Sequence, residues 1–536
     1  MGHSLEQSST EGVKQQTEHS EFTRTATVNP VPDVAMVEGG LLISTEGLSN
    51  TTGLKLASDG HTVLIPQPTD HEGDCLNWSS TRKHLVLATV AWGALTADFV
   101  GAIGSAPLLL QSMEWGHSLD KTNQPNNIVV LLLGLFGVVW VPMASYWGRA
   151  PVLFWTEVGA FCFTLGTALS PNYETFFAMR ALSAVFLTAS QTVALAFLKD
   201  MFFFHERARK IGLWACVYIC SPYIGPLLGN FVVGKTHKWE DAYWMGTGVV
   251  AIQVILVVFF IDETWFNRTV SSAYQPPRSQ SFGARMMRVT GLWQIGQDKS
   301  YFTSFKSAYH ALIVIILQPH FALVCISYFL SFMWAIGINI TTAIIFGTPK
   351  TFGGYGYDNI ALGWLHFSPI VGVIIAEVFG HYFNDFLARQ YIRRHQGVFE
   401  PEVRLWPIYI AGIFAIPGIV MVGQAIQRHL HVMAAAVGWG MYGLGVMLGS
   451  VALTAYSLDS FPMAPAEVAA WLNLARTMGG FAVGYFQQPW GKKTGYDVSF
   501  GIQAGIVTIS ILPILVVHKY GHSMRLATSK KFQNGL

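Results

Sequence analysis

The chain has 536 residues, of which 51% are hydrophobic and 12% are charged, whereas soluble domains carry about 25% charged residues. A formal net charge of +2 argues against a nucleic-acid-binding protein, and five cysteines without a Cys-x-x-Cys pair indicate neither a zinc site nor a disulfide framework. This composition excludes a large soluble catalytic domain and predicts an all-α polytopic membrane protein.

The amino-terminal segment differs from the rest of the chain. Residues 1–84 are polar, rich in Ser and Thr, and without helical or strand periodicity, which predicts a disordered cytoplasmic tail. No basic segment followed by an apolar core stands at its start, so no cleavable signal peptide is expected.

Twelve apolar runs follow, each about as long as the roughly 20 residues that a helix needs to cross a bilayer. Six lie within 85–261, at about 85–110, 127–147, 151–170, 174–198, 209–233 and 242–261. Six lie within 318–518, at about 318–346, 358–383, 405–425, 432–456, 463–487 and 498–518. Because lipid offers the backbone no hydrogen-bond partners, each run is expected to be a helix. The sequence thus predicts two six-helix halves, a central cytoplasmic loop at 262–317 and a cytoplasmic tail at 519–536.

Basic residues predict the orientation of these helices. An even number of spans puts both termini on one side, and 21 Lys and Arg residues of the loops and the carboxyl-terminal tail fall on that side. The loops of the other side hold seven. Since cytoplasmic loops are enriched in Lys and Arg, both termini are predicted to be cytoplasmic.

The layout of six plus six helices around a central loop resembles the major facilitator superfamily. Gly148 and Arg149, after the second run, are similar to the end of its loop signature, G-x-L-A-D-R-x-G-R-K. Ser145 and Tyr146 stand where the signature has Asp and Arg, so the resemblance does not extend to a salt bridge through that Asp. The segment 380–389 resembles the same signature in the second half.

The fifth run is similar to the antiporter signature G-x8-G-x3-G-P-x2-G-G of that superfamily. Four of six positions match, namely Gly212, Gly225, Pro226 and Gly229. Ser221 and Asn230 replace the other two glycines. Small residues on one helix face allow a neighbouring backbone to approach closely, so tight packing alone is an equally weighted interpretation.

Five further segments, 199–207, 262–264, 401–405, 456–462 and 473–476, resemble the fungal twelve-span drug:proton antiporter branch, including its polyamine-permease-like members. The resemblance covers about residues 80–520. It implies a monomeric plasma-membrane transporter that moves small organic molecules by alternating access, coupled to protons and without a cofactor.

Charged residues inside the apolar runs are candidates for proton coupling, because a charge at the bilayer centre costs about 2.5–3.5 kcal/mol. At a rise of ~1.5 Å per residue, Asp98 and Arg180 lie at nearly the same depth. We hypothesise that they form a pair or relay in which Asp98 binds a proton or a cationic substrate. A static ion pair is the alternative. Glu377 faces the cavity or reaches cytoplasmic water, and Arg476 is expected to pair with another helix rather than to contact substrate.

Aromatic and amide side chains suit an amphipathic organic substrate, through stacking, cation–π contacts and sparse hydrogen bonds. The predicted cavity residues are Gln191, Trp334, Asn339, Trp364, His366 and Tyr442.

Transport is therefore the predicted function. The antiporter-like pattern favours efflux, uptake of organic cations such as polyamines stays open, and a non-transporting membrane sensor is a weaker alternative. An enzyme is not expected, because the sequence offers no nucleophile–base set, no metal-ligand cluster and no phosphate-binding GxxxxGK[ST] loop. Substrate, direction and the membrane in question, plasma or vacuolar, stay open.

Overall fold

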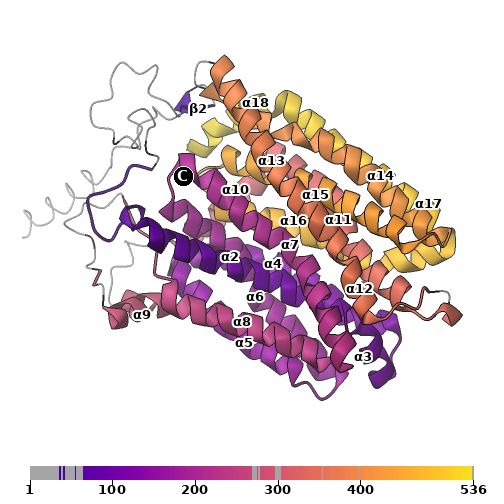
Figure 1. The fold of residues 1–536 in the computed structure, drawn as a ribbon. Helices are drawn as coiled ribbons and strands as arrows, with labels where there is room; N and C mark the ends of the chain where they lie inside the picture. Colours follow the sequence, from indigo (N-terminus) through magenta and orange to yellow (C-terminus); the bar gives the residue numbers. More distant parts are fainter. Residues whose placement is uncertain are drawn as a thin grey trace, which may run out of the picture.

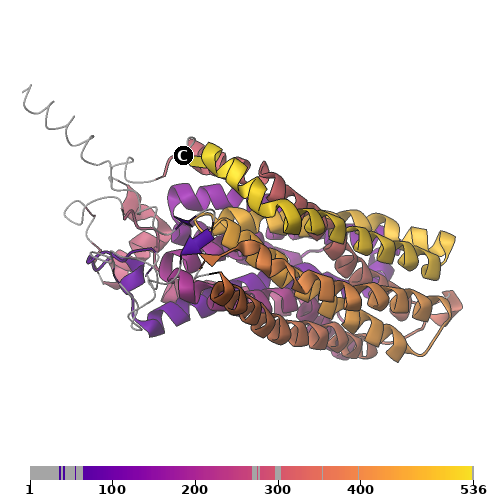
Figure 2. The same cartoon turned by 90° about the horizontal axis from the view of Figure 1, so that it is seen from above.

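The computed structural model describes residues 36–37, 40–42, 55, 64, 66–268, 275, 278–279, 281–295, 303–352, 354–395 and 398–533. Within these residues the chain is almost entirely helical, and its long helices run side by side (Figures 1 and 2). Most of the predicted amino-terminal tail, and much of the predicted central loop between 269 and 302, lie outside the described residues.

The first half contains six long helices. They are α2 (Ser80–Ala102), α4 (Leu119–Trp147), α5 (Arg149–Ala168), α6 (Tyr173–Met201), α7 (Phe204–Thr236) and α8 (Glu240–Phe260). Two short elements, η3 (Ile103–Ser105) and α3 (Leu108–Trp115), connect α2 to α4. A single turn, η2 (Cys75–Asn77), precedes α2.

The second half repeats this plan with more interruptions. Its helices are α11 (Pro319–Gly347), α12 (Asn359–Leu365), α13 (Phe367–Arg394), α14 (Pro407–Gln427), α15 (Val432–Ser460), α16 (Pro465–Thr494), α17 (Tyr496–Ile509) and α18 (Ile511–Gln533). Between the halves lie α9 (Phe282–Thr290), η5 (Leu292–Gln294) and α10 (Phe305–Ile316). The turns η7 (Lys350–Phe352) and η8 (Pro401–Leu405) complete the helical elements.

Three very short strands pair in the order β1-β2-β3. They are β1 (Met36–Val37), β2 (Gly40–Leu42) and β3 (Val398–Phe399). The pairing of Leu41 with Phe399 joins a segment near the amino terminus to the loop between α13 and α14.

The predicted all-α membrane bundle is confirmed. Among the described residues, eleven helical segments are long and apolar enough to cross a membrane. The predicted run at 463–487 corresponds to α16, which has the length of a span but is less apolar. Three of its polar side chains, Asn473, Arg476 and Gln487, are buried inside the protein rather than turned to lipid.

Two predicted boundaries differ from the structure. The tail was expected to reach residue 84, but α2 begins at Ser80 and the segment before it is ordered by an ion pair of 2.9 Å between Asp74 and Arg268. Burial raises the pKa of Asp74, but the Arg268 guanidinium and two backbone N–H groups outweigh burial and hold that pKa below its ordinary value of 3.8. The last predicted span ends at 518, whereas α18 continues to Gln533.

Ion pairs gather at one end of the bundle, which carries α9 and the carboxyl end of α18 (Figure 1). We call it the basic end. Arg288 and Arg82 both pair with Asp262 there, at 2.8 and 2.7 Å. Glu263 accepts hydrogen bonds from the backbone N–H groups of Arg149 and Ala150, at 3.2 and 3.1 Å, and so caps the amino terminus of α5.

Gly148 makes that cap possible. Its φ of +96° is a backbone conformation that favours glycine, and a Cβ there would lie 2.4 Å from Glu263 Oε2. Gly148, which matches a glycine of the loop signature, thus occupies a position where the backbone conformation favours glycine.

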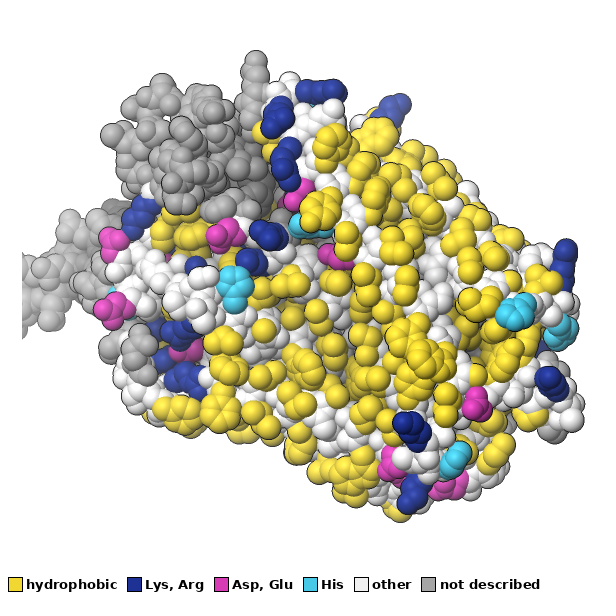
Figure 3. All heavy atoms as spheres, viewed as in Figure 1, with side chains coloured by type: hydrophobic (Ala, Val, Ile, Leu, Met, Phe, Trp, Pro, Cys, Tyr) yellow, Lys and Arg dark blue, Asp and Glu magenta, His cyan; other side chains and the backbone are white. Residues whose placement is uncertain are grey.

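The outer surface is apolar around the middle of the bundle. Figure 3 shows hydrophobic side chains over the centre of the face, with charged side chains gathered toward the ends. Exposed large apolar residues occur on both halves, among them Leu135, Trp155, Ile255, Ile375 and Leu512. Such a belt is what a lipid-facing surface requires.

Candidate functional site

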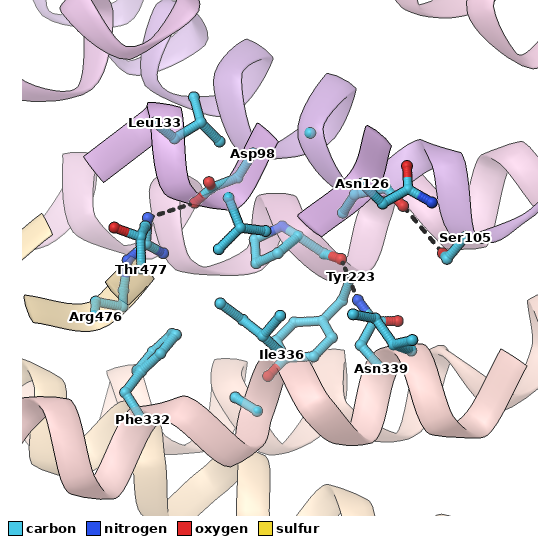
Figure 4. Close-up of a pocket in the computed structure, with 16 residues that line it drawn as sticks. Asp98, Ser105, Asn126, Leu133, Tyr223, Phe332, Ile336, Asn339, Arg476 and Thr477 are labelled. Atoms are coloured by element: carbon cyan, nitrogen blue, oxygen red, sulfur yellow. Dashed lines mark hydrogen bonds and ion pairs between the residues drawn. The ribbon is translucent and has the colours of Figure 1, made fainter. Parts of the chain in front are cut away.

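A cavity of about 70 Å³ lies between the two halves, where α2, α4 and α7 face α11 and α16 (Figure 4). Apolar side chains such as Phe332 and Ile336 form part of its wall. The polar and aromatic groups that line it are Asp98, Ser105, Asn126, Tyr223, Asn339, Arg476 and Thr477.

An ion pair across the two halves dominates this cavity. Asp98 Oδ2 on α2 lies 2.9 Å from Arg476 Nη2 on α16, and the two residues are 7% and 2% exposed. The same guanidinium lies over the rings of Tyr218 and Phe332, at 4.6 and 5.3 Å, which adds cation–π stabilisation. Each charge supplies the counter-ion that the other needs in a buried, low-dielectric place.

Asn473 holds Arg476 in this position. Its Oδ1 accepts hydrogen bonds from Arg476 Nη2 at 2.9 Å and from the Tyr218 hydroxyl at 3.0 Å. Its Nδ2 donates to the backbone carbonyl of Leu133 on α4 at 3.0 Å. One amide therefore connects α4, α7 and α16 beside the ion pair.

The predicted pairing of Asp98 with Arg180 is wrong. Arg180 is fully buried and donates to the backbone carbonyls of Val100 and Gly101 at 2.6 and 2.8 Å, and to Asn126 Oδ1 at 3.0 Å. It thereby satisfies carbonyls near the carboxyl end of α2, where helical hydrogen bonding stops. The reason for the error is geometric. Depth along a helix does not fix direction around it, and the Asp98 side chain turns toward the other half instead.

Only one of the six predicted cavity residues lines this cavity. Asn339 does, and its Nδ2 donates to the Pro222 carbonyl at 3.2 Å. His366 lies behind it, with Nε2 3.1 Å from Asn339 Oδ1 and Nδ1 2.8 Å from the Leu362 carbonyl. His366 is therefore an interior histidine that positions Asn339.

The other four predicted cavity residues lie elsewhere. Trp364 is 63% exposed and stacks on Phe367 at the surface. Tyr442 is buried and donates its hydroxyl to the Ser331 carbonyl at 2.7 Å, which packs α15 against α11. Gln191 and Trp334 are buried in helix packing and do not line the cavity. The side chain thus serves helix packing at three of these positions, and Trp364 lies at the surface.

The glycines of the antiporter-like pattern face other helices. A Cβ on Gly225 would lie 2.4 Å from the Phe99 carbonyl oxygen, and one on Gly229 would lie 2.9 Å from Ile103 Cγ1. Gly225 therefore brings α7 into backbone contact with α2, the helix that carries Asp98, and Gly229 lets α7 pack against the Ile103 side chain of η3. Pro226 lies inside α7, and its carbonyl accepts a hydrogen bond from Asn230 Nδ2 at 2.8 Å.

The halves touch at both ends of the cavity. Away from the basic end, Asn359 on α12 donates to the Ala106 carbonyl at 2.8 Å and to Asn230 Oδ1 at 3.0 Å. Asn230 stands where the antiporter signature has its last glycine, so this replacement supplies a contact between the halves. At the basic end, Arg207 Nη1 donates to the Pro462 carbonyl at 3.2 Å. The ion pair is therefore enclosed between two sets of contacts.

Sequence reasoning missed several residues of the site. Asn126 and Tyr223 line the cavity, and Tyr218 and Phe332 flank Arg476. The amides at 123, 126 and 127 are the one available signal, because three asparagines at the start of an apolar run are costly unless they are hydrogen-bonded inside the protein.

Known proteins resemble this chain along most of its length. The sequence model of the Major Facilitator Superfamily matches residues 88–484. An uncharacterized MFS-type transporter of Schizosaccharomyces pombe, C1271.10c, is 24% identical over 89% of this chain and 90% of that protein. The MFS antiporter QDR3 of Candida albicans is 22% identical over 86% of this chain and 81% of that protein.

A solved structure agrees with the fold. The xylose transporter XylE from E. coli, in a partially occluded inward open conformation, superposes with a TM-score of 0.55 at 12% identity. The match covers 82% of this chain and 99% of that one.

Proposed function

This chain belongs to the Major Facilitator Superfamily of membrane transporters, and we propose that it exports small organic molecules in exchange for protons. The observation that carries the proposal is the Asp98–Arg476 ion pair, buried between the two halves at 2.9 Å. The carboxylate of Asp98 is the proposed carrier of the proton, and Arg476 is its partner in the other half.

The pair couples ionisation to the movement of the halves. When Asp98 takes up a proton, it loses its attraction for Arg476, and separating α2 from α16 becomes less costly. When the halves close again, the guanidinium expels the proton. Alternating access of this kind moves the halves around a fixed site, as in other transporters built from two related halves.

Arg180 and Glu377 take different parts in this proposal. Arg180 holds the end of α2 through the carbonyls of Val100 and Gly101, so it fixes the position of Asp98 without touching it. Glu377 lies outside the central cavity, near the basic end.

The proposed cargo is an amphipathic organic molecule. The lining of the cavity combines the rings of Tyr223 and Phe332 with the amides of Asn126 and Asn339, which suits a largely apolar solute with a few polar groups. At about 70 Å³ the cavity is closed around the ion pair, so the solute enters when the halves move apart. The similarity of this chain to the antiporter QDR3 is consistent with exchange of solute for protons rather than symport. Uptake of organic cations is the alternative direction.

Orientation completes the proposal. The concentration of Arg at the basic end supports a cytoplasmic location for that end and for both termini. A location in the plasma membrane is part of the same proposal and rests on the resemblance to the fungal drug:proton antiporters. The protein acts as a monomer, because the cavity is complete within one chain.

The test uses purified protein in liposomes that contain a pH-sensitive dye. Benzyltrimethylammonium is added outside, because a quaternary amine cannot carry a proton by itself. We expect lumenal alkalinisation, as protons leave in exchange for the solute. Empty liposomes are the control.

Each other result has a meaning. Lumenal acidification would overturn antiport in favour of proton-coupled uptake. Entry of labelled solute without any pH change would contradict the proposed coupling of transport to protons. No entry of this or any other solute of an amphipathic panel would overturn transport and favour a sensor.

A further inference from the structure

A second cavity, of about 280 Å³, lies near the basic end between α7 of the first half and α13 and α15 of the second. It shares no lining residue with the central cavity. Its size is close to the lower end of the roughly 300–1,000 Å³ of small-molecule sites.

Four polar residues of this cavity come from one face of α13. Glu377, His381, Asn384 and Asp385 follow each other at spacings that place them on the same side of a helix. Asn384 is 4% exposed, yet among the residues that the structure describes neither its Nδ2 nor its Oδ1 has a hydrogen-bond partner. A buried amide without partners is destabilising, so its position at a cavity indicates a ligand that satisfies it.

The charges of the cavity leave one carboxylate unpaired. Arg404 pairs with Asp459 at 2.9 Å and faces Asp385 at 3.9 Å, and His381 Nε2 lies 3.8 Å from Asp385. Arg207 donates to the backbone carbonyls at 199, 202 and 462.

Glu377 is the exception. In the part of the chain that the structure describes, no basic side chain forms an ion pair with Glu377, and its Oε2 accepts no hydrogen bond. The cavity therefore lacks one positive charge beside Glu377.

Glycine keeps that carboxylate open to the cavity. Gly212 on α7 faces Glu377, and a Cβ there would lie 3.5 Å from Glu377 Oε1. A larger side chain would cover the carboxylate. The rest of the wall includes the apolar side chains of Ile211, Phe399 and Leu458 and the hydroxyl groups of Ser450 and Thr454. A cavity with one unpaired carboxylate, one buried amide without described partners and apolar side chains in its wall fits an organic amine with a hydrophobic body.

We infer that this cavity binds the protonated amine of an amphipathic organic cation, with Glu377 as its counter-ion and Asn384 as its hydrogen-bond partner. The site rests on the proposed export function, to which it adds a substrate class and a loading position at the basic end. Glu377 binds the cation, and Asp98 exchanges the proton.

Binding is measured by calorimetry on the full-length protein in detergent micelles, with phenethylamine as the probe. Phenethyl alcohol and hydrocinnamate have similar bodies with no charge and with a negative charge. We expect phenethylamine to bind at least about tenfold more tightly than either, because a charge-assisted hydrogen bond is worth roughly 1.5–3 kcal/mol.

Variants locate the site. Glu377→Gln and, independently, Asn384→Ala are each expected to weaken phenethylamine binding by about tenfold. Glu174→Gln removes an exposed carboxylate in the first turn of α6 and is the matched control. Thermal unfolding of each variant verifies that it is folded.

Three results would overturn the inference. They are equal binding of phenethyl alcohol, equal binding of hydrocinnamate, or unchanged amine binding in both folded α13 variants. Failure of the proposed function has a different signature, namely amine binding that depends on Glu377 in a protein that moves no solute in liposomes.

Discussion

Removal of one charge from the Asp98–Arg476 pair has a cost that follows from its burial. Asp98→Asn leaves a guanidinium that is 2% exposed without its counter-ion. Breaking a buried ion pair in this way costs about 3–5 kcal/mol. Arg476 keeps its hydrogen bond to Asn473 and its two aromatic neighbours, so we expect a loss of about 3 kcal/mol, near the lower limit.

Arg476→Met is expected to cost less. The remaining Asp98 can become neutral by taking up a proton, a route that Arg476 lacks because its guanidinium stays charged. The double variant has no unpaired charge. Its loss is therefore expected to be smaller than the sum of the single losses, by about 1–3 kcal/mol.

The assay is unfolding in mixed micelles with increasing sodium dodecyl sulfate, followed by tryptophan fluorescence. The four proteins of the double-mutant cycle are wild type, the two single variants and the double variant. Additive losses, within about 0.5 kcal/mol, would refute the view that these two charges stabilise each other across the halves.

Other predictions follow from single contacts. Gly225→Ala puts a methyl group against a backbone carbonyl and is expected to cost about 1–3 kcal/mol of unfolding free energy. Gly248→Ala is the control and is expected to have no such cost, because its methyl group would meet no described atom within 4 Å. The Asp74–Arg268 pair lowers the pKa of Asp74, so its stabilisation is present above pH 3.8 and lost as the pH falls below it; the difference in unfolding midpoint between wild type and Asp74→Asn should shrink there. Glu157 is 1% exposed and forms no ion pair with any residue that the structure describes, so Glu157→Gln is expected to leave the unfolding free energy unchanged or to raise it; a loss above about 2 kcal/mol would contradict this expectation.

Apolar runs predicted the helices well, because a bilayer demands about 20 apolar residues from any span. The method is weakest at α16, whose buried Asn473 and Arg476 lower its hydrophobicity because they face protein. The pattern of apolar residues also put the end of the amino-terminal tail at residue 84, whereas α2 begins at Ser80. Asp74 is ordered by Arg268, which lies 194 residues further along the chain, and no local pattern reveals such a partner.

The candidate site was only half predictable. A carboxylate in an apolar run is conspicuous, so Asp98 could be singled out, but its partner comes from the other half of the chain. The rise per residue of a helix placed Arg180 at about the depth of Asp98, but it does not tell in which direction around the helix each side chain points. The prediction of cavity residues was wrong at five of six positions for the same reason. Asn339 and Trp364 look equally suitable in sequence, yet one lines the cavity and the other is 63% exposed.

Accumulation of a labelled quaternary amine in liposomes under an imposed pH gradient tests the central claim most directly. One pH unit corresponds to about 1.4 kcal/mol, so one-for-one exchange with an acidic lumen should give up to about tenfold accumulation per unit in the wild type. Asp98→Asn should equilibrate the solute without responding to the gradient. Accumulation by Asp98→Asn that follows the gradient as in the wild type would contradict the role assigned to the ion pair.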